Sequence, residues 1–304
     1  MLIDDGDPLK VVVLADWSFM KQKQNIHHSL KKSFEYLITN DIRVNAININ
    51  GDIAYDLDSN EGENYEEFLK MLSQVSCRWP VILNAGNHEH LSKDDLYLFN
   101  NSFETYGYTK NSMTILDFGK FNYLLFDPYE IIYEGKPEEP LLEKIKNSVA
   151  LYQRKSPKPF VASSHYPILC SGKAVSCVDI EKKLRGIYTA LIDLNVCLYF
   201  GAHFHTYERI YPYIGNGKTI PLNPPYIFTP KSKYLLSIVE GVGGTDHGIA
   251  TDNNDKLPVM AAGSFNRTGY GILTFGENGY KYEHFTYLDP TSAVDHFEVE
   301  IIQT

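Results

Sequence analysis

The chain has 304 residues, of which 43% are hydrophobic and 22% are charged, a composition that excludes a disordered or fibrous protein. With 28 basic and 38 acidic residues, its formal net charge of -10 would repel a phosphate backbone, so we expect no nucleic-acid partner. No apolar run reaches the roughly 18 residues that a membrane-spanning helix needs, so we expect no transmembrane segment.

Helix and strand patterns alternate along the chain and then give way to strands alone. In chain order we predict a strand at 10–16, a helix at 22–38, a strand at 46–49, a helix at 61–75, strands at 80–83 and 123–127, a helix at 138–152, a strand at 160–164, a helix at 179–193, and strands at 197–201, 234–241, 270–276 and 280–286. A Gly-Glu-Asn-Gly turn at 276–279 joins the last two strands as a hairpin. The order predicts an α/β fold in a single domain.

Five of the predicted strands run into polar residues at their carboxyl ends. These residues are Asp16; Asp52 and Tyr55; Asn87, His88 and Glu89; His165; and His203 and His205. Loops at the carboxyl ends of strands lie beside one another in an open α/β sheet and form its ligand-binding crevice. We therefore expect these side chains to gather in one site.

The donor atoms collected there favour a pair of metal ions. Carboxylates, a phenol, an amide and imidazoles, without thiolates, suit hard or borderline ions such as Fe, Mn and Zn. One ion takes four to six donors, whereas seven candidates, one of them able to bridge, suit two ions about 3.5–4 Å apart. Each residue alone has an ordinary explanation: Asp16 could cap a helix, Asp52 could form a turn, and His165 could be a buried, hydrogen-bonded histidine. Their joint occurrence at strand ends favours the metal site.

These motifs resemble the five-motif signature of the purple acid phosphatases, a branch of the calcineurin-like metallophosphoesterases. The matching segments are Asp16, GDIAY at 51–55, GNHE at 86–89, SSHY at 163–166 and AHFH at 202–205, and the resemblance continues through TYERIYP at 206–212 and RTGYGILTF at 267–275. It covers about residues 10–290. It implies a four-layer αββα sandwich, in which helices flank two mixed sheets, and one such domain over residues 1–304.

The resemblance also implies a role for each ligand. The family pattern assigns to an Fe(III) ion the residues Asp16, Tyr55 and His205. It assigns to a second, divalent ion (Fe, Zn or Mn) the residues Asn87, His165 and His203, while Asp52 bridges both. A phenolate and carboxylates suit a trivalent ion, and imidazoles with a neutral amide suit a divalent one.

The reaction that the resemblance implies is hydrolysis of small phosphate monoesters at acidic pH by a metal-bound hydroxide. His88 would be the catalytic residue that stabilises the transferring phosphoryl group, and Glu89 would orient it. The sequence departs from the family at Ser18 and Ala202, where glycine is usual, and neither change removes a ligand. The loop after His165 lacks the histidines common in the family. Lys173 could add positive charge there but is a poor proton donor at acidic pH, so leaving-group protonation falls on His88 or on water.

The compartment is indicated by weaker signals. Cys170 and Cys177 bracket a short loop and form either a disulfide, which indicates an oxidising compartment, or two free thiols. Asn100 and Asn266 stand in Asn-x-Ser/Thr triplets and are candidate glycosylation sites. The first ten residues show no signal peptide, so the expectation of a secreted or lysosomal protein rests on the cysteines and the acid phosphatase resemblance.

Two other functions stay open. One is a related metallophosphoesterase that acts on diesters or nucleotides, which the ligand set alone does not distinguish. The other is a catalytically silent scaffold of the same fold, for which loss of ligands would be the signature, and none of the seven is missing. The sequence leaves the oligomeric state open.

Overall fold

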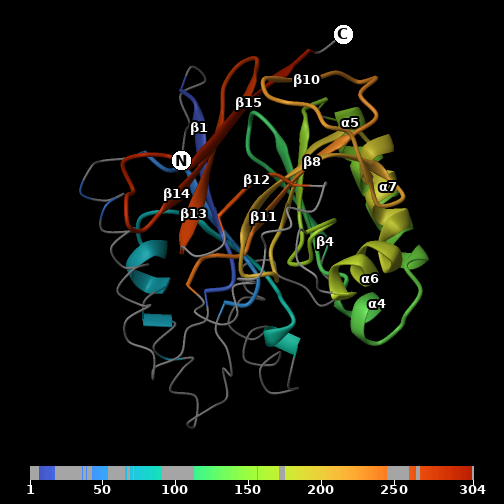
Figure 1. Cartoon of the computed structure of the whole chain (residues 1–304), viewed down its shortest axis with the longest axis horizontal. Coiled ribbons are helices and arrows are strands. Elements are labelled where there is room, and N and C mark those ends of the chain that lie inside the picture. The colour runs from blue at the N-terminus through green and yellow to red at the C-terminus, as the bar shows by residue number, and fades with distance from the viewer. Residues whose placement is uncertain are drawn as a thin grey trace.

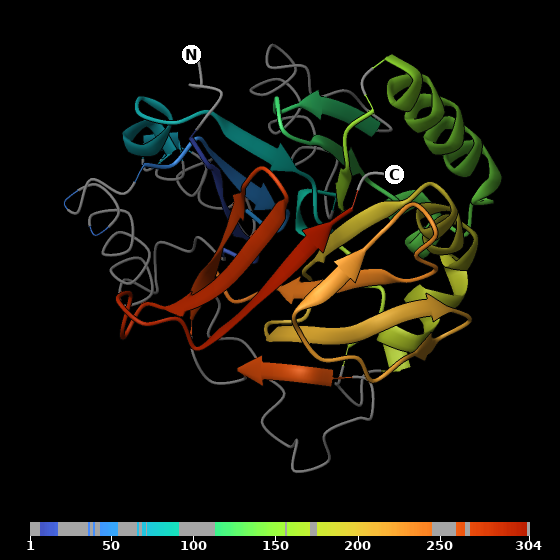
Figure 2. The same cartoon turned by 90° about the horizontal axis from the view of Figure 1, so that it is seen from above.

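Two β-sheets lie face to face in a computed structural model of the chain (Figures 1 and 2). The structure describes residues 7–17, 36, 39, 43–53, 66, 69–70, 72–90, 113–155, 157–170, 175–244, 260–264 and 268–302. In Figure 2 the red strands from the C-terminal part of the chain lie between two other groups of strands. On one side are the blue and teal strands of the N-terminal part, and on the other side are the yellow strands.

The first sheet contains seven strands in the order β10-β15-β14-β13-β1-β2-β3. Their bounds are Leu9–Leu14 for β1, Ala46–Asn50 for β2, Val81–Asn84 for β3, Tyr226–Phe228 for β10, Gly269–Phe275 for β13, Gly279–Thr286 for β14 and Asp295–Ile301 for β15. Strands β1, β2 and β3 are parallel, and β13, β14 and β15 form an antiparallel meander beside them. The sheet is therefore mixed.

The second sheet has the order β12-β8-β11-β7-β6-β5-β4, with β9 paired to β8. Its strands are β4 (Met113–Asp117), β5 (Asn122–Phe126), β6 (Phe160–Ser163), β7 (Val196–Gly201), β8 (Tyr207–Gly215), β9 (Lys218–Thr219), β11 (Leu235–Glu240) and β12 (Met260–Ser264). Strands β5, β6, β7 and β11 are parallel, and the flanking pairs are antiparallel.

Helices cover the outer face of each sheet (Figure 1). The second sheet is covered by α4 (Tyr129–Tyr133), α5 (Glu139–Lys155), α6 (Val175–Lys183) and α7 (Arg185–Asp193). The first sheet is covered by helical residues at 66, 69–70 and 72–76, which pack Leu72 and Val75 against it. This confirms the predicted four-layer αββα sandwich. That the whole chain is one domain stays a prediction.

The position of β1 between two cores explains the apolar run in its sequence. Val11 and Val13 face the core between the two sheets, whereas Val12 and Leu14 face the core under the outer helix. Because both faces of the strand are buried, residues 11–14 are all apolar instead of alternating.

The structure differs from the predicted elements at several places. The helix expected at 179–193 is two helices, α6 and α7, that meet at Leu184 (φ -110°, ψ 12°). The Glu138 carboxylate accepts a hydrogen bond from the Ile187 N–H at 3.3 Å, so α7 begins with an acceptor supplied from outside the helix. The helix α4 was not predicted, nor were six strands, which are β4, β8, β9, β10, β12 and β15. In β15 the pattern was visible, since Phe297 and Val299 point inward in alternation with exposed polar residues. The helix expected at 22–38 lies outside the described residues.

Candidate metal centre

Those of the predicted polar residues that the structure describes come together where β1, β2, β3, β6 and β7 end. Two residues after β1 stands Asp16, and its N–H donates to the Gly51 carbonyl at 3.1 Å. The N–H of Trp17 donates to the Asp52 carbonyl at 3.0 Å, so the turns after β1 and β2 are bonded together. In the second sheet the Ala202 N–H donates to the His165 carbonyl at 2.8 Å, which joins the turns after β6 and β7.

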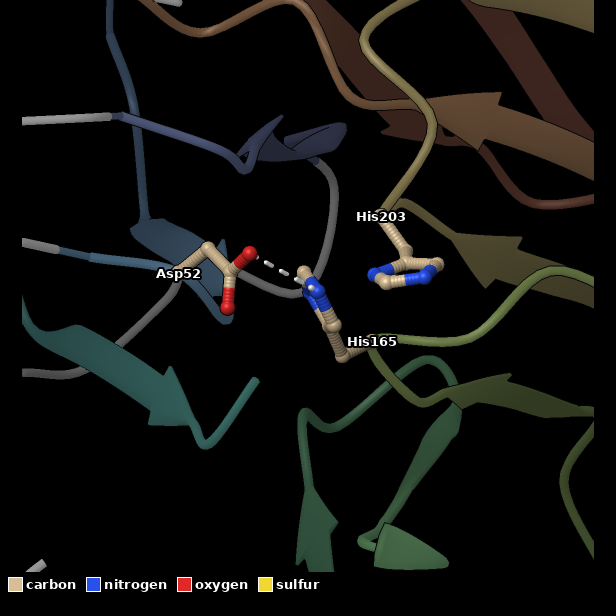
Figure 3. A group of neighbouring side chains, drawn as sticks. All are labelled: Asp52, His165 and His203. Carbon is tan, nitrogen blue, oxygen red and sulfur yellow. Dashed lines mark ion pairs between the residues drawn. The ribbon is translucent and has the colours of Figure 1, made fainter. Parts of the chain in front are cut away.

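One group of ligands surrounds Asp52. Donor atoms of Asp52, His165 and His203 all lie within 4.8 Å of one another (Figure 3). The Nε2 atom of His165 is 3.3 Å from Asp52 Oδ2 and 3.2 Å from Asn87 Oδ1. These four residues are the set predicted for the second ion together with the bridging carboxylate.

A second group surrounds Asp16. Its Oδ1 atom is 3.4 Å from His205 Nε2, and its Oδ2 atom accepts the His203 N–H at 2.9 Å. Asp16 and His205 are two of the residues predicted for the first ion. The third, Tyr55, lies outside the described residues. Since the backbone of His203 binds Asp16 while its ring belongs to the group around Asp52, the two groups are neighbours.

The donor atoms present fit a metal pair. Among the described residues, Asp16 Oδ1 and His203 Nδ1 are buried atoms without a hydrogen bond. A buried carboxylate oxygen or imidazole nitrogen without a hydrogen bond costs free energy, and a bound cation would offset that cost. Oxygen and imidazole nitrogen donors without thiolate are the set that a hard or borderline cation prefers.

The backbone of three ligands is held in a conformation that non-glycine residues seldom adopt. Asp16, Asp52 and His203 have φ values of 54°, 49° and 69°, in the left-handed region. Among the described non-glycine residues only Asn195 and Asn216 share this feature, and asparagine tolerates it best. Strain of this kind persists where the surrounding structure enforces it, as at binding and catalytic sites.

Charge in the site follows from the paired carboxylates and imidazoles. Burial opposes ionisation of Asp52, but the neighbouring His165 and His88 hold the pKa of its carboxyl well below its usual range. Burial also opposes a charge on His165, yet Asp52 and Asp16 raise its pKa to about 10. Burial and the charge on His165 lower the pKa of His203 to about 3. In the metal-free protein His165 is therefore a cation among carboxylates, and His203 is neutral and able to donate a lone pair.

Glu89 connects two of the ligand turns through their backbone. Its carboxylate is buried and accepts hydrogen bonds from the N–H groups of Gly86 (2.7 Å), Asp52 (2.9 Å) and Ile53 (2.8 Å). Burial and the charge of Asp52 raise its pKa to about 7. We predicted that Glu89 orients His88, but these three bonds show it holding the turn after β3 against the turn after β2.

His88 stands above this pair of turns at the edge of the site. Its N–H donates to Asp52 Oδ1 at 2.9 Å, and its ring Nε2 is 3.9 Å from Asp52 Oδ2. Its side chain is 26% exposed, whereas that of Asp52 is 2% exposed. A partly exposed imidazole beside a buried ligand is in a position to meet an incoming substrate, and its catalytic role stays a prediction.

Asn50 is a residue of the site that the sequence analysis missed. Its backbone carbonyl is 2.9 Å from His165 Nδ1, which leaves Nε2 of that ring to face Asp52 and Asn87. Its side-chain amide donates to the carbonyls of Ser164 (2.7 Å) and Phe200 (3.2 Å). The feature that could have identified Asn50 is a polar side chain in a strand whose five residues are all buried.

Gly86 and Gly51 were predicted only as parts of motifs, and the structure shows what they do. A Cβ atom on Gly86 would overlap the Asp52 carboxylate, and one on Gly51 would lie 2.6 Å from His165 Nδ1. Gly51 also has a φ of 88°, which favours glycine. Both glycines let the backbone come close to the ligands.

Asn50→Ala is expected to lower the free energy of unfolding by about 3 kcal/mol, because the carbonyls of Ser164 and Phe200 would lose a buried donor. Denaturant unfolding of the metal-free protein measures this loss. Asn278→Ala, at an exposed position in the turn between β13 and β14, is the control and should change stability by less than about 0.5 kcal/mol. Equal stability of the two variants would contradict the role given to Asn50.

His90 and Asp127 form an ion pair beside the site. His90 Nε2 is 2.7 Å from Asp127 Oδ2, and the two side chains are 14% and 7% exposed. Burial disfavours the imidazolium, but the hydrogen bond and charge of Asp127 outweigh it and raise the pKa of His90 above its ordinary value. The pair is therefore charged in mildly acidic solution.

Asp127→Asn is expected to destabilise the protein more at pH 5.5 than at pH 8.5, by about 1–2 kcal/mol. A raised pKa means that the contribution of His90 is complete below the pKa of the unfolded chain and is lost as the pH rises through the folded-state pKa. Denaturant unfolding at both pH values measures the difference. Asp117→Asn is the control: Lys158 lowers the pKa of Asp117, so its effect should be constant between pH 5.5 and 8.5. An Asp127→Asn effect that does not change with pH would contradict the assignment.

Cys170 and Cys177 form a disulfide, which was one of the two predicted alternatives, the other being two free thiols. Their Cα–Cα distance of 6.2 Å is within the usual range.

Lys173, between them, and the sequon residues Asn100 and Asn266 lie outside the described residues. Within the described part of the chain, no helix combines the length and apolarity needed to cross a membrane.

Comparison with known proteins identifies the family of the chain. Residues 9–207 match the family model described as calcineurin-like phosphoesterase. Proteins named acid phosphatase type 7 from Mus musculus and Homo sapiens are each 26% identical over 212 residues, covering 59% of this chain and 46% of those proteins. The chain thus spans about half the length of the curated relatives it matches.

Solved structures share the fold at low sequence identity. The structure of purple acid phosphatase PPD1 from yellow lupin (Lupinus luteus) seeds has a TM-score of 0.73 at 15% identity and covers 97% of this chain and 54% of that one. GAP50, described as the anchor in the inner membrane complex of Plasmodium, has a TM-score of 0.67 at 15% identity, covering 97% and 90%. A dimetal phosphatase from Danio rerio has a TM-score of 0.58 at 12% identity, covering 97% and 99%. The predicted purple acid phosphatase resemblance is confirmed by these comparisons.

Proposed function

The chain belongs to the calcineurin-like phosphoesterase family, and from this we propose that it is an acid phosphatase that hydrolyses small phosphate monoesters at a dinuclear Fe(III)–M(II) centre, with M being Fe, Zn or Mn. The observation that carries the proposal is the convergence of six of the seven predicted ligands into two neighbouring groups.

In this proposal each group holds one ion. The first is held by Asp16 and His205, with Tyr55 as the predicted third residue. The second is held by Asn87, His165 and His203, and Asp52 belongs to both. Two such ions would bind phosphate oxygens, offset their charge and activate water for attack on phosphorus. A phenolate ligand and a trivalent ion suit activity at acidic pH, because a higher ionic charge lowers the pKa of water further.

Other residues of the chain position the metal ligands and assist the reaction. Asn50 and Glu89 hold the ligand turns, so the donor atoms are in place before substrate arrives. His88, partly exposed beside Asp52, donates a hydrogen bond to the transferring phosphoryl group or a proton to the leaving oxygen. His165 must release its proton when a cation binds beside Asp52, so metal affinity falls at low pH.

A secreted or lysosomal location, with glycosylation at Asn100 and Asn266, belongs to the same proposal. The Cys170–Cys177 disulfide supports it, since disulfides persist in oxidising compartments.

The deciding experiment combines metal analysis, a visible spectrum and a substrate comparison on the purified chain. Two metals per chain, a visible charge-transfer band from a Tyr–Fe(III) pair, and faster hydrolysis of 4-nitrophenyl phosphate than of bis(4-nitrophenyl) phosphate at pH 5 are expected. Two metals without colour and a preference for the diester would favour a diesterase. No metal uptake and no hydrolysis of either ester would favour a scaffold and contradict the proposal.

A further inference from the structure

A continuous arc of aromatic rings runs beside the metal centre and begins and ends at it. The Tyr166 ring is 5.4 Å from the His203 ring and 6.1 Å from the Tyr133 ring. The Tyr133 ring is 4.9 Å from that of Tyr129, which stacks on His90 at 4.0 Å. His203 is a candidate ligand and His90 follows His88 by two residues, so both ends of the arc lie at the site.

The middle of the arc is open to solvent. Tyr133 is 50% exposed, although it lies between the rings of Tyr129 and Tyr166. The Tyr133 ring is separated from the ring of the candidate ligand His203 by one ring, that of Tyr166. A half-exposed aromatic ring that is one ring away from a candidate metal ligand offers a flat apolar surface to a group attached to what the metals bind.

Tyr166 adds a polar group that lacks a partner. Its side chain is fully buried, and its hydroxyl forms no hydrogen bond with any described residue. The Tyr166 ring packs between the Tyr133 ring of α4 and the ring of the candidate ligand His203, so the residue lies between α4 and the ligands. A buried donor without a partner is unusual in a native structure and is satisfied when a ligand or water reaches it.

Helix α4 is fixed so that its aromatic face remains at the site. Tyr129 and Tyr133 are four residues apart and share one face, and Ile131 and Ile132 are buried in the core, against which Tyr129 also packs. Asp127 accepts the Tyr129 N–H at 3.0 Å, and Lys183 of α6 donates to the Ile132 carbonyl at 2.6 Å. In Figure 1 α4 lies next to α6 at the end of the second sheet.

We propose that the arc is a subsite for an aromatic leaving group, in which the ring of an aryl phosphate monoester stacks on Tyr133 while its phosphate occupies the metal centre. This inference rests on the proposed function and names its substrate class. In the reaction the phosphorus–aryl oxygen bond breaks, water supplies the oxygen that joins phosphorus, and a proton of that water leaves with the phenol. The ring itself is unchanged, so the subsite also binds the phenol product.

Binding of phosphonates tests the subsite without turnover, because their phosphorus–carbon bond is not hydrolysed. Calorimetric titration of the metal-loaded full chain with phenylphosphonate and with methylphosphonate is expected to show about fivefold tighter binding of the phenyl compound. Tyr133→Ala should abolish this preference and leave the affinity for methylphosphonate unchanged. Tyr133→Phe should retain the preference, and Tyr133→Leu, which is apolar but not flat, should lose most of it.

Tyr211→Ala, at a partly exposed tyrosine of β8, is the matched control and should retain the wild-type preference. Equal affinities of the wild type for both phosphonates, no binding of either, or an unchanged preference in Tyr133→Ala would each overturn the subsite. Thermal unfolding checks that every variant is folded, and Tyr133→Leu replaces Tyr133→Ala if the latter is not. Hydrolysis of 4-nitrophenyl phosphate by the wild type, assayed separately, tests the proposed function, so the failure of one can be told from the failure of the other.

Discussion

Asp52→Ala is expected to lose bound metal and to lower kcat by about a thousandfold or more, because metal ions supply several kcal/mol of charge stabilisation in such reactions. Asp52 is the ligand that we propose to bridge the two ions. Its Oδ2 atom is 3.3 Å from His165, and its Oδ1 atom accepts the His88 N–H at 2.9 Å. Without it, two cations close together would lack the anion between them.

Metal content per chain and kcat at pH 5 measure this effect together. Asp52→Asn, which preserves shape and removes charge, should lie between Asp52→Ala and the wild type in metal content. The control is Asp117→Ala on β4, whose carboxylate is 47% exposed and pairs with Lys158, and it should retain full metal content and rate. An Asp52→Ala variant with two metals and wild-type activity would show that the bridging role is wrong.

The sequence predicted the site well because its residues stand where buried strands end. The strands before Asp16 and Asp52 are buried on both faces and mostly apolar, so they are clear in the sequence, and parallel strands carry their carboxyl ends to one edge. The order of strands in two separate sheets did not follow from periodicity. The two-sheet arrangement was predicted only from the family resemblance. Periodicity is a local signal, whereas the pairing of β1 with β13 joins residues about 260 positions apart in the chain.

What the sequence did not predict depends on contacts between distant segments. Asn50 forms bonds with residues 113 to 150 positions away, and no local pattern shows those partners. The break between α6 and α7 depends on Glu138, which precedes another helix. The aromatic arc joins α4 to the turns after β3, β6 and β7, and in the sequence its tyrosines are indistinguishable from packed aromatics. Tyr55 and Lys173 remain predictions.

His88→Ala is expected to retain both metals and to lower kcat at pH 5 by about 10²–10⁴-fold. The contact of His88 with Asp52 through its backbone N–H survives the substitution, so the ligand turn should keep its geometry. What is lost is an imidazole that is 26% exposed and lies 3.9 Å from the bridging carboxylate. His296→Ala, at an exposed histidine of β15, is the control and should leave kcat unchanged.

The dependence of this loss on the leaving group separates the two roles open to His88. If the ring donates a proton to the leaving oxygen, His88→Ala should slow glycerol phosphate far more than 4-nitrophenyl phosphate, whose leaving group departs without protonation. If the ring instead stabilises charge on the phosphoryl oxygens, the two substrates should slow by similar factors, because that charge is common to both. A variant that retains most of its kcat with both substrates at pH 5 would contradict either role. Leaving-group protonation would then fall on water, because the loop after His165 offers a lysine and no histidine.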